Sequence, residues 1–151
     1  METQFIFGEL DVERLSEALS LVREVFLEYE APEYSAEGIQ EFMRFIEPAA
    51  INKMLSEGAI HIWTCENDGQ IIGVIGARSG HINLLFVSGE YHCKGIARRL
   101  FNMMAEHFKP AAITVNSSPY AVEAYHKLGF VDTDAEQSVN GIRFIPMKCV
   151  L

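Results

Sequence analysis

The 151-residue sequence has few cysteines, a single tryptophan and no long apolar run. No apolar stretch reaches the ~18–20 residues needed to span a bilayer, so we expect no membrane partner. The three cysteines, Cys65, Cys93 and Cys149, lack a CxxC pair, which argues against a disulfide framework and against a zinc signature. Residues 1–4 lack the basic region of a secretory signal, so we expect a cytoplasmic protein with reduced thiols.

Basic side chains are also scarce, with 12 Lys and Arg against 21 Asp and Glu and a formal net charge of −9. This charge argues against binding to nucleic acid. The imbalance lies early in the chain, because residues 1–60 carry 13 acidic and 4 basic side chains while residues 61–151 carry 8 of each. The acidic part is either a set of solvated helix faces or the source of a field that favours a cationic ligand.

The length and the ordinary globular composition predict one domain over residues 1–151, with a mixed α/β (α+β) architecture. Helices are expected over about 11–30 with Asp11 as N-cap, from Ser35 onward with Pro48 ending that helix or opening a third, over 95–108 and over 119–128. Strands are expected at 4–7, 59–65, 70–78, 81–87, 112–116, 130–138 and 142–149, with turns at 67–69 and 140–141. Hairpins combined with a strand–helix–strand crossover imply a mixed sheet covered by helices.

The segment 84–100 is the part of the sequence that most directly indicates chemistry. An apolar strand leads through a loop into a helix, and Gly95 in that loop lets the backbone approach a ligand closely. The N–H groups at a helix N-terminus bind anions, and Lys94, Arg98 and Arg99 add positive charge. The segment matches neither GxxxxGK[ST] nor GxGxxG. Taken alone, it is also compatible with an ordinary strand-to-helix turn with solvated basic side chains.

Residues 92–97 (HCKGIA) resemble the [Gln/Arg]-x-x-Gly-x-[Gly/Ala] phosphate-binding loop of the Gcn5-related N-acetyltransferase (GNAT) superfamily. A second block, residues 116–130 (NSSPYAVEAYHKLGF), resembles the family's Asn…Ala-x-x-[Phe/Ala]-Tyr-x-Lys-Leu-Gly-Phe block, and residues 141–147 resemble its closing strand. His92 departs from the usual Gln or Arg, and Gly89 stands where many members have Pro. The histidine implies weaker or pH-dependent binding of the anion.

The resemblance implies a GNAT-type, mostly antiparallel mixed sheet of six to seven strands with a splayed pair, flanked by about four helices. It implies an acetyl-CoA-dependent N-acetyltransferase that transfers acetyl directly to a primary amine of a small, cationic molecule or of a protein, and a possible homodimer. Two alternatives stay open at this point: a catalytically inactive CoA-binding sensor on the same fold, and transfer of a longer acyl group. We expect no metal, because the histidines show no ligand spacing.

The resemblance also assigns roles to individual residues. Tyr125 matches the general acid that protonates the CoA thiolate, although a helix tyrosine is also an ordinary core residue. Candidate bases for the amine are His81, which strand alternation places on one face with Asn83, Leu85 and Val87, and Glu28, with Glu30 and Glu33 as rivals in a loop lined by Tyr29 and Tyr34. The residues expected to bind acetyl-CoA are Leu85, Phe86, Val87, His92, Cys93, Lys94, Gly95, Ile96, Ala97, Arg98, Asn116 and Tyr125.

Overall fold

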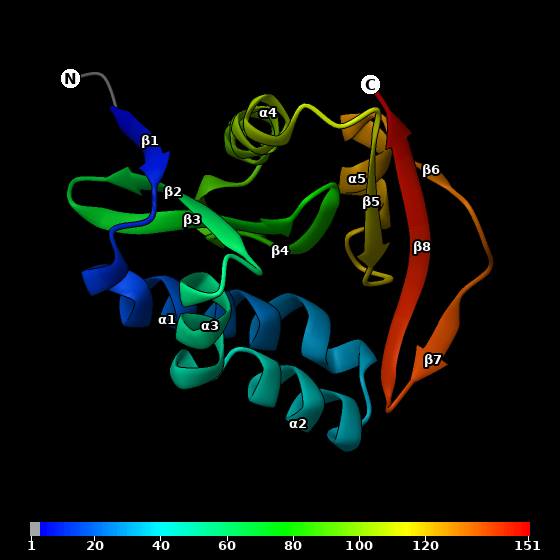
Figure 1. The fold of residues 1–151 in the computed structure, drawn as a ribbon. Helices are drawn as coiled ribbons and strands as arrows, with labels where there is room; N and C mark the ends of the chain where they lie inside the picture. The colour runs from blue at the N-terminus through cyan, green and yellow to red at the C-terminus, as the bar shows by residue number, and fades with distance from the viewer. Residues whose placement is uncertain (1–3) are drawn as a thin grey trace.

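The computed structural model describes residues 4–151 and shows one twisted sheet between two layers of helices (Figure 1). Met1–Thr3, and with them Glu2, lie outside the described residues. The strands are β1 (Phe5–Glu9), β2 (His61–Asn67), β3 (Gln70–Arg78), β4 (His81–Val87), β5 (Ala112–Ser117), β6 (Val131–Asp132), β7 (Gln137–Val139) and β8 (Ile142–Val150). Their order is β1-β2-β3-β4-β5-β8-β6, with β7 also paired to β8. All neighbours are antiparallel except β4 and β5.

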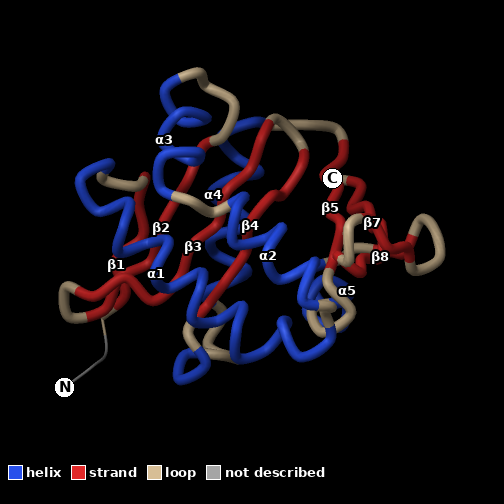
Figure 2. The backbone as a smooth tube through the Cα atoms, turned by 90° about the horizontal axis from the view of Figure 1, so that it is seen from below, coloured by secondary structure: helices blue, strands red, loops and turns tan. Residues whose placement is uncertain are grey.

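Two apolar clusters hold the helices on the two faces of the sheet. The helices are α1 (Leu15–Val25), α2 (Ala36–Phe45), α3 (Pro48–Ser56), α4 (Ile96–Phe108) and α5 (Val122–Leu128). The view from below shows α1 and α2 crossing the face opposite α4 (Figure 2). This arrangement confirms the expected mixed sheet covered by helices, and Pro48 begins a third helix rather than only ending the second.

The first predicted helix, 11–30, is divided into three segments of different geometry. Asp11 caps a 3₁₀ turn (Val12–Arg14) by accepting a 3.0 Å hydrogen bond from Glu13 N–H, and α1 follows. The chain then forms a π turn over Phe26–Glu30 and a second 3₁₀ turn over Ala31–Glu33. Single π turns recur at functional sites, where they change the direction in which side chains point.

Both predicted hairpin turns are present because their central residues take positive φ angles. Asp68 (φ 52°) and Gly69 (φ 76°) join β2 to β3, while Asn140 (φ 53°) and Gly141 (φ 80°) join β7 to β8. This is the geometry that type I′ turns require and that Asn-Gly and Asp-Gly sequences favour.

The predicted strand 130–138 is wrong in its continuity, which is why the sheet has eight strands rather than six to seven. The segment pairs with β8 first at Val131 and Asp132 and again at Gln137–Val139. Pro146 of β8 lies between the two paired stretches and has no N–H to donate to the ladder. The predicted helix 119–128 is also shorter and begins at Val122.

The predicted alternation along β4 is also wrong, because Asn83 is the extra residue of a β-bulge against β3. Leu84 pairs with Gly76 and Ile82 with Ala77, so the pleat is reset at the bulge. Ile82 therefore packs in the same cluster as Val87, whereas Leu84 packs in the opposite cluster with α1. His81 thus faces away from the face that carries Leu85 and Val87.

The parallel pair β4–β5 separates soon after it begins. In the part of the chain that the structure describes, the two strands pair only at His81↔Thr114 and Ile82↔Val115. Beyond these pairs β4 continues to Val87 and β5 to Ser117 without pairing to each other. This is the splayed pair that the sequence resemblance implies.

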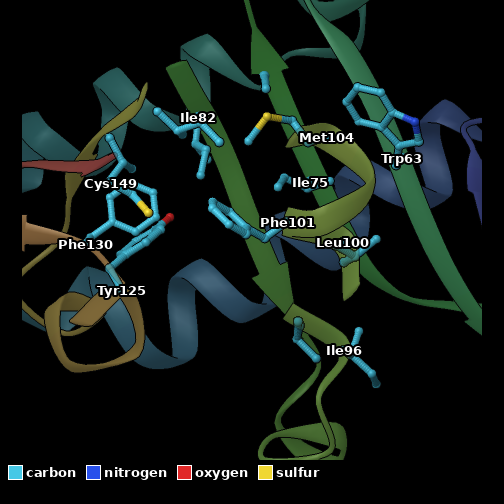
Figure 3. Packing of buried hydrophobic residues seen from close by; sticks show 14 of the residues in the cluster. Trp63, Ile75, Ile82, Ile96, Leu100, Phe101, Met104, Tyr125, Phe130 and Cys149 are labelled. Atoms are coloured by element: carbon cyan, nitrogen blue, oxygen red, sulfur yellow. The ribbon is translucent and has the colours of Figure 1, made fainter. Parts of the chain in front are cut away.

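The buried cluster beneath α4 extends to α5 and so connects the splayed strands to the second sequence block. Figure 3 shows Tyr125 of α5 beside Phe130 and Cys149 and facing Phe101 of α4. The Tyr125 and Phe130 rings meet edge to face, with centroids 5.3 Å apart. Burial within this cluster holds the Tyr125 ring in place.

Candidate functional site

The backbone of β4 presents polar groups to the opening between β4 and β5. Ser88 N–H donates to Ile72 O of β3 (2.8 Å), and the groups of alternate residues in an antiparallel strand point to opposite sides. The N–H and C=O groups of Leu85 and Val87 therefore point away from β3, toward the opening. The Val87 carbonyl oxygen lies 2.7 Å from His92 Nε2. The N–H of Val87 and both polar groups of Leu85 remain for a ligand.

The loop after β4 ends in the N-terminus of α4. Cys93 (φ 63°) and Gly95 (φ 79°) both have positive φ angles, and α4 begins at Ile96. Within residues 4–151, no side chain caps this helix, and its first intrahelical bond runs from Arg99 N–H to Gly95 O (3.1 Å). The N–H groups of residues 96–98 point outward at the positive end of the helix dipole and form a cradle for an anion.

Two side chains, one from this loop and one from the first turn of α4, hold the surrounding structure together. Arg98 donates through Nη2 to the Lys127 carbonyl oxygen at the end of α5 (2.5 Å). His92 connects the loop to Val87 at the end of β4, as described above. The residues of this segment that are expected to bind phosphate therefore offer mainly backbone groups to an anion. The exposed Lys94 side chain lies nearby.

An aromatic bridge, consisting of Tyr29, His92 and Tyr120, crosses the rims of the splayed strands. The Tyr29 ring stacks on Tyr120 after β5 (centroids 5.2 Å apart, planes at 16°) and lies 5.1 Å from the His92 ring after β4. Gly89 lies beneath it, and a Cβ at that position would meet the Tyr29 hydroxyl and force it to shift. The π turn therefore lies over the end of the site that the loop and β5 form.

Tyr125 lies inside this framework and keeps its proton firmly. Its side chain is 7% exposed. Burial raises the pKa of Tyr125 above its usual range, and the nearby Glu30 carboxylate raises it further. Asn116, the other predicted residue of the second block, is exposed on β5.

Glu30, the last residue of the π turn, has the most perturbed carboxyl group of the site. Burial raises its pKa from 4.5 to about 7, the polar Ser118 side chain lowers it, and the Glu33 charge raises it again. The pKa of Tyr34 is also raised, mainly by burial and then by Glu30 and Glu33. The Glu30 charge thus acts on both tyrosines, Tyr34 and Tyr125.

The C-terminal hairpin fixes this region from outside. Arg143 of β8 donates to the Glu33 carbonyl oxygen (3.1 Å) and binds both Glu136 carboxylate oxygens (3.0 and 3.1 Å). Gly38 of α2 packs so tightly on Gly141 that a Cβ would overlap the Gly141 carbonyl. The start of α2 and the β7–β8 turn are therefore packed directly against each other.

Comparison with known proteins identifies the family that has this arrangement. Residues 30–151, most of the chain, match the model of the acetyltransferase (GNAT) domain. The chain belongs to the GNAT acetyltransferase family. No relative is matched among the curated proteins. The general activity of the family is acetyl transfer from acetyl-CoA.

Solved GNAT structures have the same fold over almost the whole chain. A GCN5-related N-acetyltransferase from Rhodopseudomonas palustris matches 100% of this chain and 99% of its own, with a TM-score of 0.83 and 19% identity. A PaiA N-acetyltransferase from Thermoplasma acidophilum, in complex with coenzyme A, matches 98% and 99% with a TM-score of 0.82 and 19% identity. An aminoglycoside 6′-N-acetyltransferase complexed with coenzyme A matches 96% of both chains, with a TM-score of 0.66 and 16% identity.

The two base candidates favoured by the GNAT resemblance lie in different places, His81 on β4 and Glu28 on the π turn. His81 is at the paired end of β4, where its Nδ1 lies 2.8 Å from Thr114 Oγ1. Burial lowers the pKa of His81, and the Arg78 charge lowers it further. Glu28 belongs to the same π turn as Glu30, but its side chain is exposed.

Sequence reasoning missed Ser118 and Tyr120 as residues of this GNAT site. Both fall in the variable part of the second block, between Asn116 and Ala121, where the family pattern specifies no residue. Only the positions that the fold gives them, beside Glu30 and Tyr29, reveal their contacts. Among residues 4–151, no group of three or more His, Cys, Asp or Glu side chains is placed to hold a metal. None of the described helices is long and apolar enough to cross a membrane.

Proposed function

We propose that this chain transfers an acetyl group from acetyl-CoA directly to a cationic primary amine. The observation that carries the proposal is the separation of β4 from β5 beyond Ile82 and Val115. An amide-containing arm such as pantetheine needs strand-like hydrogen-bonding groups, and the backbone of Leu85 and Val87 supplies them in the opening. Asn116 on β5 would contact the arm from the other side.

The backbone groups of the cradle would hold the pyrophosphate of acetyl-CoA. The N–H groups of Ile96, Ala97 and Arg98 point outward from the start of α4, and Gly95 keeps the approach open because it has no side chain. Val87 N–H would donate to the thioester carbonyl oxygen, where negative charge develops during attack. Such donors are effective because they are oriented before the reaction.

Tyr125 would give its proton to the departing sulfur. Its raised pKa keeps the phenol protonated until a thiolate forms, and its buried position excludes competing water. General-acid catalysis of this kind contributes typically about 10²–10⁴-fold to a rate.

The acceptor side of the site is suited to a cation. Glu30 and Glu33 lie beside aromatic side chains, and carboxylates and ring faces both attract ammonium groups. A lysine-type amine must first lose a proton, which costs roughly 4.6 kcal/mol at pH 7 for a pKa near 10.4. The base that takes this proton would be His81 or Glu28, the two residues that the sequence favours, or one of their rivals Glu30 and Glu33.

The proposal is tested by measuring thiol release from acetyl-CoA with spermidine, kanamycin, free lysine and a lysine-containing peptide. We expect turnover with at least one cationic amine and a preference for acetyl-CoA over propionyl-CoA and succinyl-CoA. Tight binding of CoA without thiol release across these amines would instead support a sensor. Equal rates with the three acyl donors would contradict the acetyl assignment.

A further inference from the structure

We propose that His92 is a positioning residue for acetyl transfer, because its ring holds the Val87 carbonyl group and so fixes the end of β4 at the thioester. This inference rests on the proposed function and deepens it. It starts from one contact, in which His92 Nε2 lies 2.7 Å from the Val87 carbonyl oxygen. In this role the side chain acts through the Val87 backbone, without touching acetyl-CoA.

The peptide group between Val87 and Ser88 is held at both of its ends. Its N–H, which belongs to Ser88, donates to Ile72 O of β3 (2.8 Å). Its carbonyl oxygen, which belongs to Val87, lies within hydrogen-bond distance of the His92 ring. A trans peptide is planar, and its N–H and C=O point in opposite directions. The two bonds therefore hold one rigid plane from opposite sides and fix its rotation about the strand.

The end of β4 needs this support because β5 does not provide it there. In the described part of the chain, β4 pairs with β5 only as far as Ile82, whereas β4 continues to Val87. On the side that faces the opening, His92 thus takes the place of a neighbouring strand. The Val87 N–H lies on the same side and is the donor proposed for the thioester carbonyl oxygen. Its direction depends on how the strand is held at its end.

The bond also changes which polar groups the opening presents. A free Val87 carbonyl oxygen would direct negative partial charge toward the region where the proposed oxyanion develops. The His92 N–H occupies this oxygen, so Val87 offers a donor to the thioester and no competing acceptor. Donors that are fixed in advance stabilise an oxyanion best.

The path of the loop brings His92 back to the end of β4. Residues Gly89–Tyr91 form a 3₁₀ turn, in which Tyr91 N–H donates to Ser88 O (2.9 Å). His92 follows in an extended conformation, with φ −64° and ψ 151°. One short turn therefore reverses the chain and lets residue 92 bond to residue 87.

The aromatic bridge holds the His92 ring in this position. The Tyr29 ring lies 5.1 Å from the His92 ring, centroid to centroid, and stacks on Tyr120 at 5.2 Å. Gly89 leaves room for the Tyr29 hydroxyl, which a Cβ at that position would meet at 2.2 Å. Tyr29 comes from the π turn, so a segment far away in the sequence keeps the imidazole against Val87.

The bond requires one particular form of the imidazole ring. A carbonyl oxygen only accepts, so Nε2 must carry the hydrogen, and in the neutral ring Nδ1 then carries none. NMR of the ring nitrogens at about pH 8.5, where an ordinary histidine is neutral, should show this tautomer for His92, assigned by its absence in His92→Gln. A neutral ring protonated at Nδ1 cannot donate to Val87 and would overturn the inference.

The kinetic test uses three variants, with acetyl-CoA and the best amine of the panel above. His92→Leu removes the donor, and His92→Gln keeps an N–H donor. Tyr91→Phe is the matched control, because it removes a different hydrogen bond of the same turn, from Asn67 Nδ2 to Tyr91 Oη (2.9 Å). We expect kcat to fall about 10–100-fold in His92→Leu, because the thioester donor is misplaced. The kcat of His92→Gln should lie between those of His92→Leu and the wild type, and that of Tyr91→Phe within about twofold of the wild type.

Binding is measured separately, because a positioning role and a binding role predict different changes. CoA has no acetyl group, and its pyrophosphate is expected at the N–H groups of residues 96–98. The Kd for CoA by calorimetry and the KM for acetyl-CoA should therefore stay within about threefold in His92→Leu. The urea midpoint of His92→Leu should stay close to that of the wild type.

Each other outcome overturns either the inference or the function on which it rests. A wild-type kcat in His92→Leu, or equal losses in His92→Leu and His92→Gln, would show that the donor has no part in catalysis. A loss found wholly in the Kd for CoA would mean that His92 binds the cofactor itself, and an unfolded His92→Leu would mean that the contact serves stability. If the wild type acetylates none of the amines, the proposed function fails, while the tautomer still decides whether the bond exists.

Discussion

Replacing Glu30 by glutamine should stabilise the protein at alkaline pH, because it removes a carboxyl group whose pKa is raised in the folded state. The folded state holds the Glu30 proton up to a pKa of about 7, whereas an unfolded carboxyl releases it near 4.5. Between these values the folded state binds more protons, so stability falls as pH rises and stays reduced above about pH 7. At about 1.4 kcal/mol per pKa unit, the full effect is about 3 kcal/mol. Partial exposure of the side chain reduces this to about 1–2 kcal/mol.

The assay is urea unfolding of the wild type, Glu30→Gln and Glu24→Gln at pH 5 and at pH 8.5. We expect Glu30→Gln to gain about 1–2 kcal/mol relative to the wild type at pH 8.5 and much less at pH 5. The exposed Glu24→Gln control should stay within about 0.5 kcal/mol at both values. An equal gain for Glu30→Gln at both pH values would refute the reasoning, because the effect would then not depend on ionisation.

Three further predictions concern two close glycine contacts and the charge of the acidic N-terminal part. Gly89→Ala should lower the free energy of unfolding in urea by about 1–3 kcal/mol, because its Cβ meets the Tyr29 hydroxyl. Adding Tyr29→Phe to the same chain should recover part of this loss. Additive effects of the two changes would contradict the contact. Gly38→Ala should destabilise the protein by about 3 kcal/mol or more and expose the β7–β8 turn to protease, because the new Cβ would overlap the Gly141 backbone. Protease resistance equal to that of the wild type would show that the turn and α2 are not docked. With a cationic acceptor, kcat/KM should fall as ionic strength rises from about 20 to about 300 mM. A kcat/KM that does not change with salt would mean that the acidic side chains of the N-terminal part are only solvated and do not attract the substrate.

Features set by local chemistry could be predicted from the sequence. The two hairpin turns need only residues that tolerate positive φ, and both Asp68-Gly69 and Asn140-Gly141 supply them. The strand–loop–helix around Gly95 is equally local, because a glycine at φ 79° and an uncapped helix start follow directly from the motif. The splayed strand pair came from the resemblance to the family, not from the spacing of residues.

Features that depend on distant neighbours could not be predicted. The bulge at Asn83 arises from its pairing with β3, and it turns His81 away from the face on which simple alternation had placed it. The division of strand 130–138 depends on Pro146 across the sheet. Glu30 stood among several glutamates in the sequence, and its distinct environment appears only when Ser118 and Tyr125 fold against the π turn.

The acidic surplus of the first sixty residues also divides into different roles in the structure. Glu17 accepts a hydrogen bond from Ile71 N–H (3.0 Å), which lowers its pKa and fixes α1 to β3. Glu41 pairs with Arg44 on α2. Glu30 and Glu33 lie beside the proposed acceptor position, so the charge that bears on substrate is smaller and more local than the net −9 of that segment.

The most direct test of the central claim is thiol release from acetyl-CoA by the wild type and by Tyr125→Phe with the same cationic amine. The phenyl ring keeps the packing against Phe130 and removes only the hydroxyl. We expect kcat to fall about 10²–10⁴-fold while the Kd for CoA and the urea midpoint change little. A Tyr125→Phe enzyme that retains wild-type kcat would contradict the account, because the buried hydroxyl would then have no part in acetyl transfer.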